Sequence, residues 1–263
     1  MKIPIAKKYK ILFVSNYKIK VHDGLHRAID ILGFDRYNVS DQVPDFTQYD
    51  FILGHGAFGS SVDRLLQMLP NKKGLCIGGN VKSQEDSKYD VMFYETRWVR
   101  DFLNLKGNCY QAFGINSEIF NELDITLHRY KAIDYLSVGA LALWKRHEKL
   151  AYKKGIRLVV GELQRDNKLE SIGIANNLIA SGVGVMPQIK SEMLSRLYHS
   201  SRTVYIPADI FGGGERAVWE AKACGIPVEI ELDNPKLKEL VDSPVLDEYQ
   251  YARDLAGGIV SCL

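Results

Sequence analysis

The residues best suited to chemistry lie in residues 204–228, the stretch VYIPADIFGGGERAVWEAKACGIPV. Three consecutive glycines, Gly212, Gly213 and Gly214, separate a short apolar run from a helical pattern that begins with Glu215. Glycines let a backbone approach a ligand with no Cβ in the way. The free amides and the dipole of a helix's first turn attract phosphate. This stretch therefore predicts a phosphate-binding loop between a strand and a helix.

A second acidic residue, Glu220, lies in the middle of the predicted helix 215–224. Its position relative to Ala217 and Ala221 places it near the face that the apolar spacing buries. A carboxylate there either pairs with a cation or accepts hydrogen bonds from ligand hydroxyls. The other interpretation is a glycine-rich turn beside an ordinary solvated glutamate, and the pattern alone leaves both open.

The surrounding sequence resembles the C-terminal domain of GT-B glycosyltransferases, which have two Rossmann-like domains, and specifically retaining glycosyltransferase family 4. That family has a leucine–tyrosine pair, a proline after a strand and then the pattern EA-x-AcG-x-PV. The matches, in order and spacing, are Leu197-Tyr198, Pro207, Glu220-Ala221, Ala223-Cys224-Gly225 and Pro227-Val228. The resemblance implies that Glu220 holds the ribose of a nucleotide-sugar, and that the glycine loop holds its phosphates and sugar.

The sequence departs from the family pattern at two positions. The family has a second glutamate, which contacts the donor sugar, where this chain has Gly212. Asp209 and Glu215 flank the glycines and could each replace it, so Glu215 is predicted to be both a donor-binding and a catalytic residue. The family also has an arginine where this chain has Ala140, and Arg146 could supply the missing charge.

The resemblance places Lys145 at the lysine that neutralises the donor diphosphate, within a segment, 140–155, that is predicted to be one helix. A departing nucleoside diphosphate needs its charge neutralised. Lys145 and the helix that follows the glycines would share this task, so neither a metal nor another cofactor is expected. Gly139 ends the preceding strand, and Glu162 follows the next strand at the family's turn near the nucleotide, which makes both predicted donor-binding residues.

In the first half, the run KILFVS predicts a buried parallel strand, and the helix LHRAIDILG follows it after a loop. The resembled family has a glycine at this loop, facing the acceptor and the donor sugar, and Gly24 matches it; the neighbouring His22 and Asp23 are predicted with Gly24 as acceptor-binding residues. The alternative is that the two polar residues are simply polar loop residues. His55 follows a predicted strand at 49–54, and the ends of parallel strands are where open α/β sheets bind ligands. The resembled family often has a histidine at the equivalent strand end, near the donor sugar, so we predict His55 as catalytic; the alternative is a structural histidine.

Strands and helices alternate in both halves, which predicts an α/β protein with two Rossmann-like domains facing each other across a cleft, as in GT-B enzymes. The expected N-terminal, acceptor-side domain is 1–125, and the expected nucleotide-sugar domain is 126–246. A C-terminal helix, about 247–263, is expected to pack back on the first domain. The run KLKEL at 236–240 is predicted to be a solvated helix face.

Composition narrows the class of protein. The chain has 263 residues, 46% of them hydrophobic and 25% charged, which is ordinary for a globular protein. Its formal net charge of +2 is too small to indicate a polyanionic partner. No apolar run approaches the ~18 residues of a membrane span, and no signal peptide is evident. Four separated cysteines without a C-x-x-C favour reduced thiols, so a cytoplasmic protein is expected.

Together these features predict a glycosyltransferase, of hexosyltransferase type, that moves a sugar from a nucleotide-diphosphate sugar such as a UDP-sugar to an acceptor hydroxyl. The resemblance favours retention of configuration and a glycan or lipid-linked glycan as acceptor. The N-terminal lysines could contact an anionic membrane surface, or DNA if the chain is a phage-type enzyme that acts on hydroxymethylated bases. The two departures also leave open a non-catalytic sugar-nucleotide-binding protein. An unrelated α/β nucleotide binder is disfavoured by the lack of a G-x-G-x-x-G motif.

Overall fold

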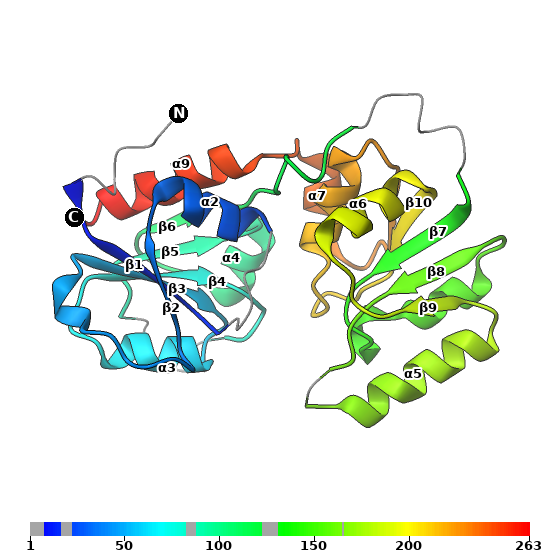
Figure 1. Ribbon diagram of the computed structural model, residues 1–263, viewed down its shortest axis with the longest axis horizontal. Helices are drawn as coiled ribbons and strands as arrows, with labels where there is room; N and C mark the ends of the chain where they lie inside the picture. The colour runs from blue at the N-terminus through cyan, green and yellow to red at the C-terminus, as the bar shows by residue number, and fades with distance from the viewer. Residues whose placement is uncertain (1–7, 17–22, 83–87, 123–130, 165) are drawn as a thin grey trace. The chain divides into compact units, whose positions relative to one another are not determined.

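The structure of this protein is a computed structural model that describes residues 8–16, 23–82, 88–122, 131–164 and 166–263 (Figure 1). The chain forms two compact units. Unit 1 comprises Met1–Asn116 and Leu246–Leu263, and unit 2 comprises Ser117–Val245. No helix of the described residues is both long and apolar enough to cross a membrane.

Unit 1 is built on a six-stranded sheet with the order β2-β1-β3-β4-β5-β6, in which all neighbours are parallel. Its strands are β1 Ile11–Ser15, β2 Asp35–Asn38, β3 Phe51–Gly56, β4 Lys73–Ile77, β5 Val91–Tyr94 and β6 Cys109–Gln111. Every residue of β1, β4 and β5 is buried, because helices cover both faces of a parallel sheet. The order reverses between β1 and β3, so their carboxyl ends form the switch point of this sheet.

The helices of unit 1 lie on both faces of its sheet. They are α2 Gly24–Leu32, α3 Ser61–Met68, α4 Arg97–Leu103 and α9 Glu248–Val260, with a 3-10 turn, η1, at Phe46–Gln48. The C-terminal helix α9 packs beside α2 (Figure 1). Leu255 and Ile259 of α9 share one core cluster with Ile29 of α2 and Phe13 of β1. The end of the chain therefore completes the hydrophobic core of unit 1.

Unit 2 is built on a five-stranded parallel sheet with the order β11-β10-β7-β8-β9. Its strands are β7 Ile133–Val138, β8 Arg157–Val160, β9 Gly184–Met186, β10 Ser201–Ile206 and β11 Val228–Ile230. Its helices are α5 Lys168–Ala180, α6 Ser191–His199, α7 Glu215–Ala223 and α8 Pro235–Asp242. The first strand, β7, lies between β10 and β8, so the switch point of unit 2 lies at the carboxyl ends of β7 and β10.

The division between the units falls between Asn116 and Ser117, whereas the sequence suggested 125 and 126. The residues just after the observed division are held by unit 2. The ring of Phe120 packs on Tyr198 with centroids 5.9 Å apart, and Ser195 Oγ donates to the carbonyl of Ile119 over 2.8 Å.

The predicted single helix over 140–155 is wrong. Two 3-10 turns, η3 Leu143–Lys145 and η4 His147–Tyr152, occupy this segment, separated by Arg146 in the left-handed conformation with φ 50°. The guanidinium of Arg146 donates to the carbonyls of Pro207 and Ala208, and these tertiary contacts fix the break.

The run KLKEL is also not a solvated face. It forms most of α8, which packs against α7, and Lys236, Leu237 and Leu240 are buried. Lys236 is fully buried, and its ammonium pairs with the carboxylate of Glu215 on α7. The lysine therefore belongs to the interior of unit 2.

Candidate functional site

The glycine loop of unit 2 joins β10 to α7 at the switch point, so the predicted strand–loop–helix arrangement is present. Gly214 is the N-cap of α7 and provides no side chain to cap the helix. Its φ of 138° is a conformation that residues with a Cβ rarely adopt. The helix that begins at Glu215 therefore starts in a backbone shape that favours glycine.

The first two glycines of the loop face different surroundings. A Cβ on Gly212 would lie 2.3 Å from the carbonyl oxygen of Trp144, which also accepts the amide of Asp209. A side chain at Gly212 would therefore collide with the backbone of η3. A Cβ on Gly213 would instead lie 3.1 Å from Glu215 Oε2 and 3.4 Å from Lys145 Nζ.

Lys145 and Glu215 meet beside Gly213, and Lys236 pairs with Glu215. Lys236 Nζ lies 2.7 Å from Glu215 Oε1, and only 8% of Glu215 is exposed. The half-buried Lys145 approaches from η3, and its Cε lies 3.2 Å from the position that a Cβ on Gly139 would occupy. The structure therefore brings together four predicted donor-binding residues, Gly139, Lys145, Gly213 and Glu215, and adds Lys236.

Burial and the charges of this cluster shift the pKa values of Lys145 and Glu215. Burial lowers the pKa of Lys145 to about 8, and repulsion by Lys236 and Arg216 acts in the same direction against the attraction of Glu215 and Asp209. Burial alone would disfavour the ionised form of Glu215, but attraction and hydrogen bonding to Lys236 prevail and its pKa is lowered. A bound phosphate would favour the charged form of Lys145.

The predicted ribose ligand, Glu220, lies on the buried face of α7. The hydroxyl of the fully buried Tyr198 donates to Glu220 Oε2 over 3.1 Å. Burial, followed by the adjacent charge of Glu220, raises the pKa of Tyr198 well above its ordinary value. Tyr198 therefore stays protonated and orients the Glu220 carboxylate.

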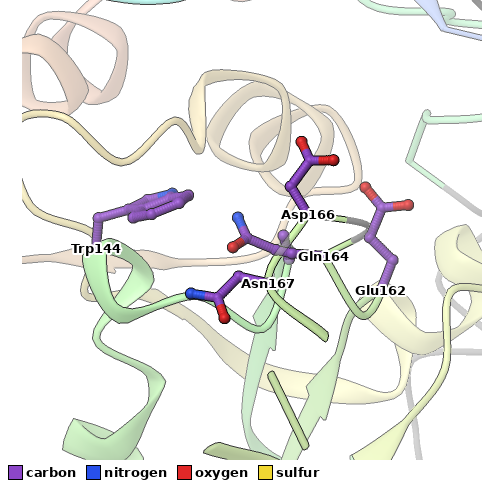
Figure 2. A pocket seen from close by; sticks show the side chains of 6 residues that line it. Trp144, Glu162, Gln164, Asp166 and Asn167 are labelled. Carbon is purple, nitrogen blue, oxygen red and sulfur yellow. The ribbon is translucent and has the colours of Figure 1, made fainter. Parts of the chain in front are cut away.

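A cavity of about 480 Å³ lies at the carboxyl ends of β7 and β8 (Figure 2). Its lining residues are Ala140, Trp144, Glu162, Gln164, Asp166 and Asn167. Figure 2 shows the indole of Trp144 on one side and the carboxylates of Glu162 and Asp166 on the other. An aromatic face with hydrogen-bonding groups opposite can hold a planar base or a sugar ring. Of this set, only Glu162 was predicted as a donor-binding residue, because Trp144 and the rest match no family motif.

A neutral histidine, also missed from the sequence, supports the wall of this cavity. Burial, followed by repulsion from Lys145, lowers the pKa of His147 to about 4. Its Nε2 lies 3.1 Å from the Ala140 carbonyl, which can only accept, so Nε2 carries the proton. Nδ1 then accepts from Ser137 Oγ at 3.0 Å. These bonds fix the segment from β7 to Lys145.

Arg146 does not replace the missing family arginine. Its guanidinium forms a two-pronged ion pair with Asp233, with N–O distances of 2.7 and 2.8 Å, in addition to its contacts with two backbone carbonyls. Among the described residues, no group of three or more His, Cys, Asp or Glu side chains is arranged to hold a metal.

The acceptor-binding residues predicted in unit 1 have structural roles where they are described. His22 lies outside the described residues. Asp23 caps α2, and its Oδ1 accepts the amide of His26 at 2.9 Å and contacts His26 Nδ1 at 2.8 Å. A Cβ on Gly24 would lie 1.9 Å from the carbonyl oxygen of Gly114, so close backbone packing requires this glycine.

His55 lies near the end of β3, at the switch point of unit 1, and is half-buried. Its Nε2 lies 2.8 Å from the position that a Cβ on Gly78 would occupy, so the ring packs over that glycine. Its catalytic role stays a prediction, as do the roles assigned to the residues of unit 2.

Comparison with known proteins identifies the fold. No protein-family model and no curated protein matches this chain. Among solved structures, HepE from Anabaena in complex with UDP and glucose has a TM-score of 0.66 at 12% identity, covering 97% of this chain and 89% of that chain. Sucrose-phosphate synthase from Thermosynechococcus elongatus has a TM-score of 0.65 at 15% identity, covering 96% and 89%.

A third structure combines a nucleotide with nucleic acid. An α-glucosyltransferase in complex with UDP and a 13-mer DNA containing an HMU base has a TM-score of 0.51 at 12% identity, covering 96% of this chain and 91% of that chain. At these identities the likeness concerns the fold. This chain has the two-Rossmann-domain fold of the GT-B glycosyltransferases, as the sequence predicted.

Proposed function

We propose that this protein is a glycosyltransferase that moves a sugar from a nucleoside-diphosphate sugar to an acceptor hydroxyl. The observation that carries the proposal is the meeting of Lys145, Glu215 and Gly213 at the switch point of unit 2. Open α/β sheets bind ligands at such points. The likeness to HepE, which was solved with UDP and glucose, supports a UDP-sugar as donor.

Each part of the site has a proposed role. Lys145 neutralises the charge of the diphosphate, so that the nucleoside diphosphate can depart without a metal. Glu220, oriented by Tyr198, accepts hydrogen bonds from the ribose hydroxyls. Glu215 contacts the donor sugar, and the cavity beside Trp144 and Glu162 holds a further part of the donor. Retention of configuration, action in the cytoplasm and contact with an anionic membrane surface remain part of the proposal.

The first experiment is a thermal-shift panel of UDP, GDP, ADP, CDP and dTDP with their common sugars. A ligand that binds only the folded state raises the melting temperature. We expect one nucleotide series to give a clear shift, EDTA to leave it unchanged, and Glu220→Ala to abolish it. Glu148→Ala removes an exposed carboxylate from η4 of the same unit and should behave as wild type. Absence of any shift with wild-type protein would refute the proposal.

A transfer assay then separates the acceptors. A glycan or lipid-linked glycan is the acceptor class that we propose first. DNA with hydroxymethylated bases is the second candidate, because the α-glucosyltransferase solved with DNA shares the fold over 96% of this chain. With a labelled donor, product mass spectrometry of glycan, lipid-linked glycan and hydroxymethylated duplex identifies the acceptor. Tight nucleotide binding with neither transfer nor donor hydrolysis would favour a non-catalytic binding protein.

A further inference from the structure

Unit 2 contains a buried ion pair between α8 and α7. The side chain of Lys236 has no exposed surface, that of Glu215 has 10%, and 2.7 Å separates Nζ from Oε1. Burying two charges costs more free energy than burying apolar residues of the same size, so such a pair is weak evidence for stability. Leu237, the next residue of α8, is fully buried and shows that this face of the helix accepts apolar side chains.

The position of the pair suggests what else it does. Glu215 is the first residue of α7, and its second oxygen, Oε2, lies near Gly213, as Lys145 Nζ does. The charges of both ammonium groups therefore act on this carboxylate. The three side chains together carry a net charge of +1 when all are ionised.

Without Lys236, the charge balance of the site would change. Glu215 would keep its negative charge beside Lys145 and would become the natural partner of that lysine. An approaching diphosphate would then meet a cation that is already neutralised, and a nearby carboxylate that repels it.

We propose that Lys236 is a positioning residue of the donor site, which neutralises Glu215 and so leaves the charge of Lys145 for the diphosphate of the ligand. This inference rests on the proposed function. It assigns a functional role to a side chain that cannot itself reach solvent.

The proposal makes the two partners of one ion pair act in opposite directions. Lys236→Met lowers the net charge of the trio to zero and should weaken diphosphate binding at least about tenfold, given charges a few ångströms apart in a poorly solvated site. Glu215→Gln raises the net charge to +2 and should strengthen binding. The double variant restores +1 and should bind diphosphate probes without a donor sugar as wild type does, because the proposed sugar contact of Glu215 plays no part in their binding. A pair with a purely structural role would weaken binding in both single variants.

Calorimetric titration tests whether affinity follows the net charge of these three side chains. The ligands are UDP and inorganic pyrophosphate, a probe that lacks base and ribose. Lys238→Met is the matched control, because it removes one positive charge from the exposed side of the same helix, where Lys238 pairs with Asp242. It should leave both affinities unchanged. If Lys236→Met does not fold, the direction of the affinity change in Glu215→Gln still distinguishes the positioning role from a purely structural role.

The outcomes separate the two proposals. Weaker binding in Glu215→Gln, or equal affinities in all variants, overturns the role of Lys236 and leaves the nucleotide site intact. If wild-type protein binds no nucleotide in the thermal-shift panel, the proposed function fails and this inference fails with it.

Discussion

In both units, a helix with glycine at or next to its amino end follows a strand at the switch point of a parallel sheet, yet the two glycine sites have different surroundings. In unit 1 the amino end of α2 is capped by Asp23, and Gly24 packs directly on the backbone of Gly114. In unit 2 the N-cap of α7 is Gly214, which offers no side chain, and Gly213 faces charged groups.

The comparison shows that a strand–glycine–helix pattern does not by itself define a ligand site. A glycine can be required because another backbone passes within van der Waals distance, as at Gly24, or because a ligand must approach, as we propose for Gly213. The two cases are distinguished by what a Cβ would meet. A rigid carbonyl indicates packing, whereas the ends of flexible charged side chains leave room for a ligand.

The largest expected effect tests the packing role in unit 1. Gly24→Ala would place a Cβ 1.9 Å from the Gly114 carbonyl oxygen, and the backbone of one loop must move to relieve the clash. We expect a loss of about 3 kcal/mol in the free energy of unfolding, at the upper end of the usual cost of overpacking, measured by urea denaturation. Gly257→Ala, in α9 of the same unit, meets nothing within 4 Å and should be neutral or stabilising by up to ~1 kcal/mol. A stable Gly24→Ala protein would contradict the packing interpretation.

The second prediction separates two adjacent glycines of unit 2. Gly213→Ala meets only the ends of Glu215 and Lys145, so the fold should be retained while UDP binding weakens about tenfold, the cost of displacing one charged contact. Gly212→Ala meets the Trp144 carbonyl at 2.3 Å and should lower the melting temperature as well. Thermal unfolding measures the melting temperature of both variants, and calorimetry measures their affinity for UDP. Equal stability losses would mean that Gly213 also serves packing.

The fold could be largely predicted from the sequence because buried parallel strands leave a strong signal. The run KILFVS predicted a strand over 10–15, and β1 is Ile11–Ser15. Strand β2, Asp35–Asn38, was missed because it is polar and half of its residues are exposed at the sheet edge. The break at Arg146 was missed because contacts with distant carbonyls, rather than local propensity, produce it.

The site could be predicted only where a residue's type matches a motif. Lys145, Glu215 and Gly213 match or flank the resembled pattern, and they lie together in the structure. Lys236 occurs in an ordinary charged run, and nothing in that run reveals that one lysine points inward. His147 likewise gives no sequence signal, because its role depends on its contacts with Ser137 and Ala140.

A smaller effect should come from the hydroxyl that orients Glu220. Tyr198→Phe removes the hydrogen bond to Glu220 Oε2 and leaves the buried ring in place. We expect UDP binding to weaken about three- to tenfold, since a hydrogen bond to a charged group contributes about 1 kcal/mol or more. Tyr205→Phe is the matched control, because Tyr205 also donates to a glutamate, but that glutamate is Glu231, directly after β11, and not Glu220 of α7. If Tyr205→Phe lost affinity for UDP and Tyr198→Phe did not, Glu220 would not belong to the nucleotide site.

One lysine in each unit, Lys73 and Lys145, has a pKa that burial lowers, and the two should respond differently to nucleotide. Lys73 of unit 1 also has a pKa lowered by burial, but its ammonium donates to the carbonyls of Leu66 and Leu69 at the end of α3. Its titration should therefore be independent of nucleotide. Lys145 of unit 2 has a pKa of about 8 and lies where we propose that the diphosphate binds.

The sign of the effect follows from which state holds the proton. The charged groups that act on Lys145 are Glu215, Asp209, Lys236 and Arg216, with His147 neutral beside it. Bound diphosphate raises the pKa of Lys145, so binding takes up protons and UDP affinity falls as pH rises through about 8, by at most tenfold per pH unit. The stability of the ligand-free protein has the opposite dependence. The unfolded lysine, with its pKa near 10.5, binds more protons, so the contribution of Lys145 to stability rises between pH 8 and 10.5.

Calorimetry with UDP between about pH 7.5 and 9.5, where the terminal phosphate is already ionised, measures the first slope. Measurements in buffers of different ionisation enthalpy count the protons taken up. Lys145→Met should bind UDP weakly, with an affinity that does not change with pH. Lys73 is still present in this variant, so any remaining pH dependence would include its contribution. A slope that survives Lys145→Met would assign the titration to another group and would remove Lys145 from the diphosphate site.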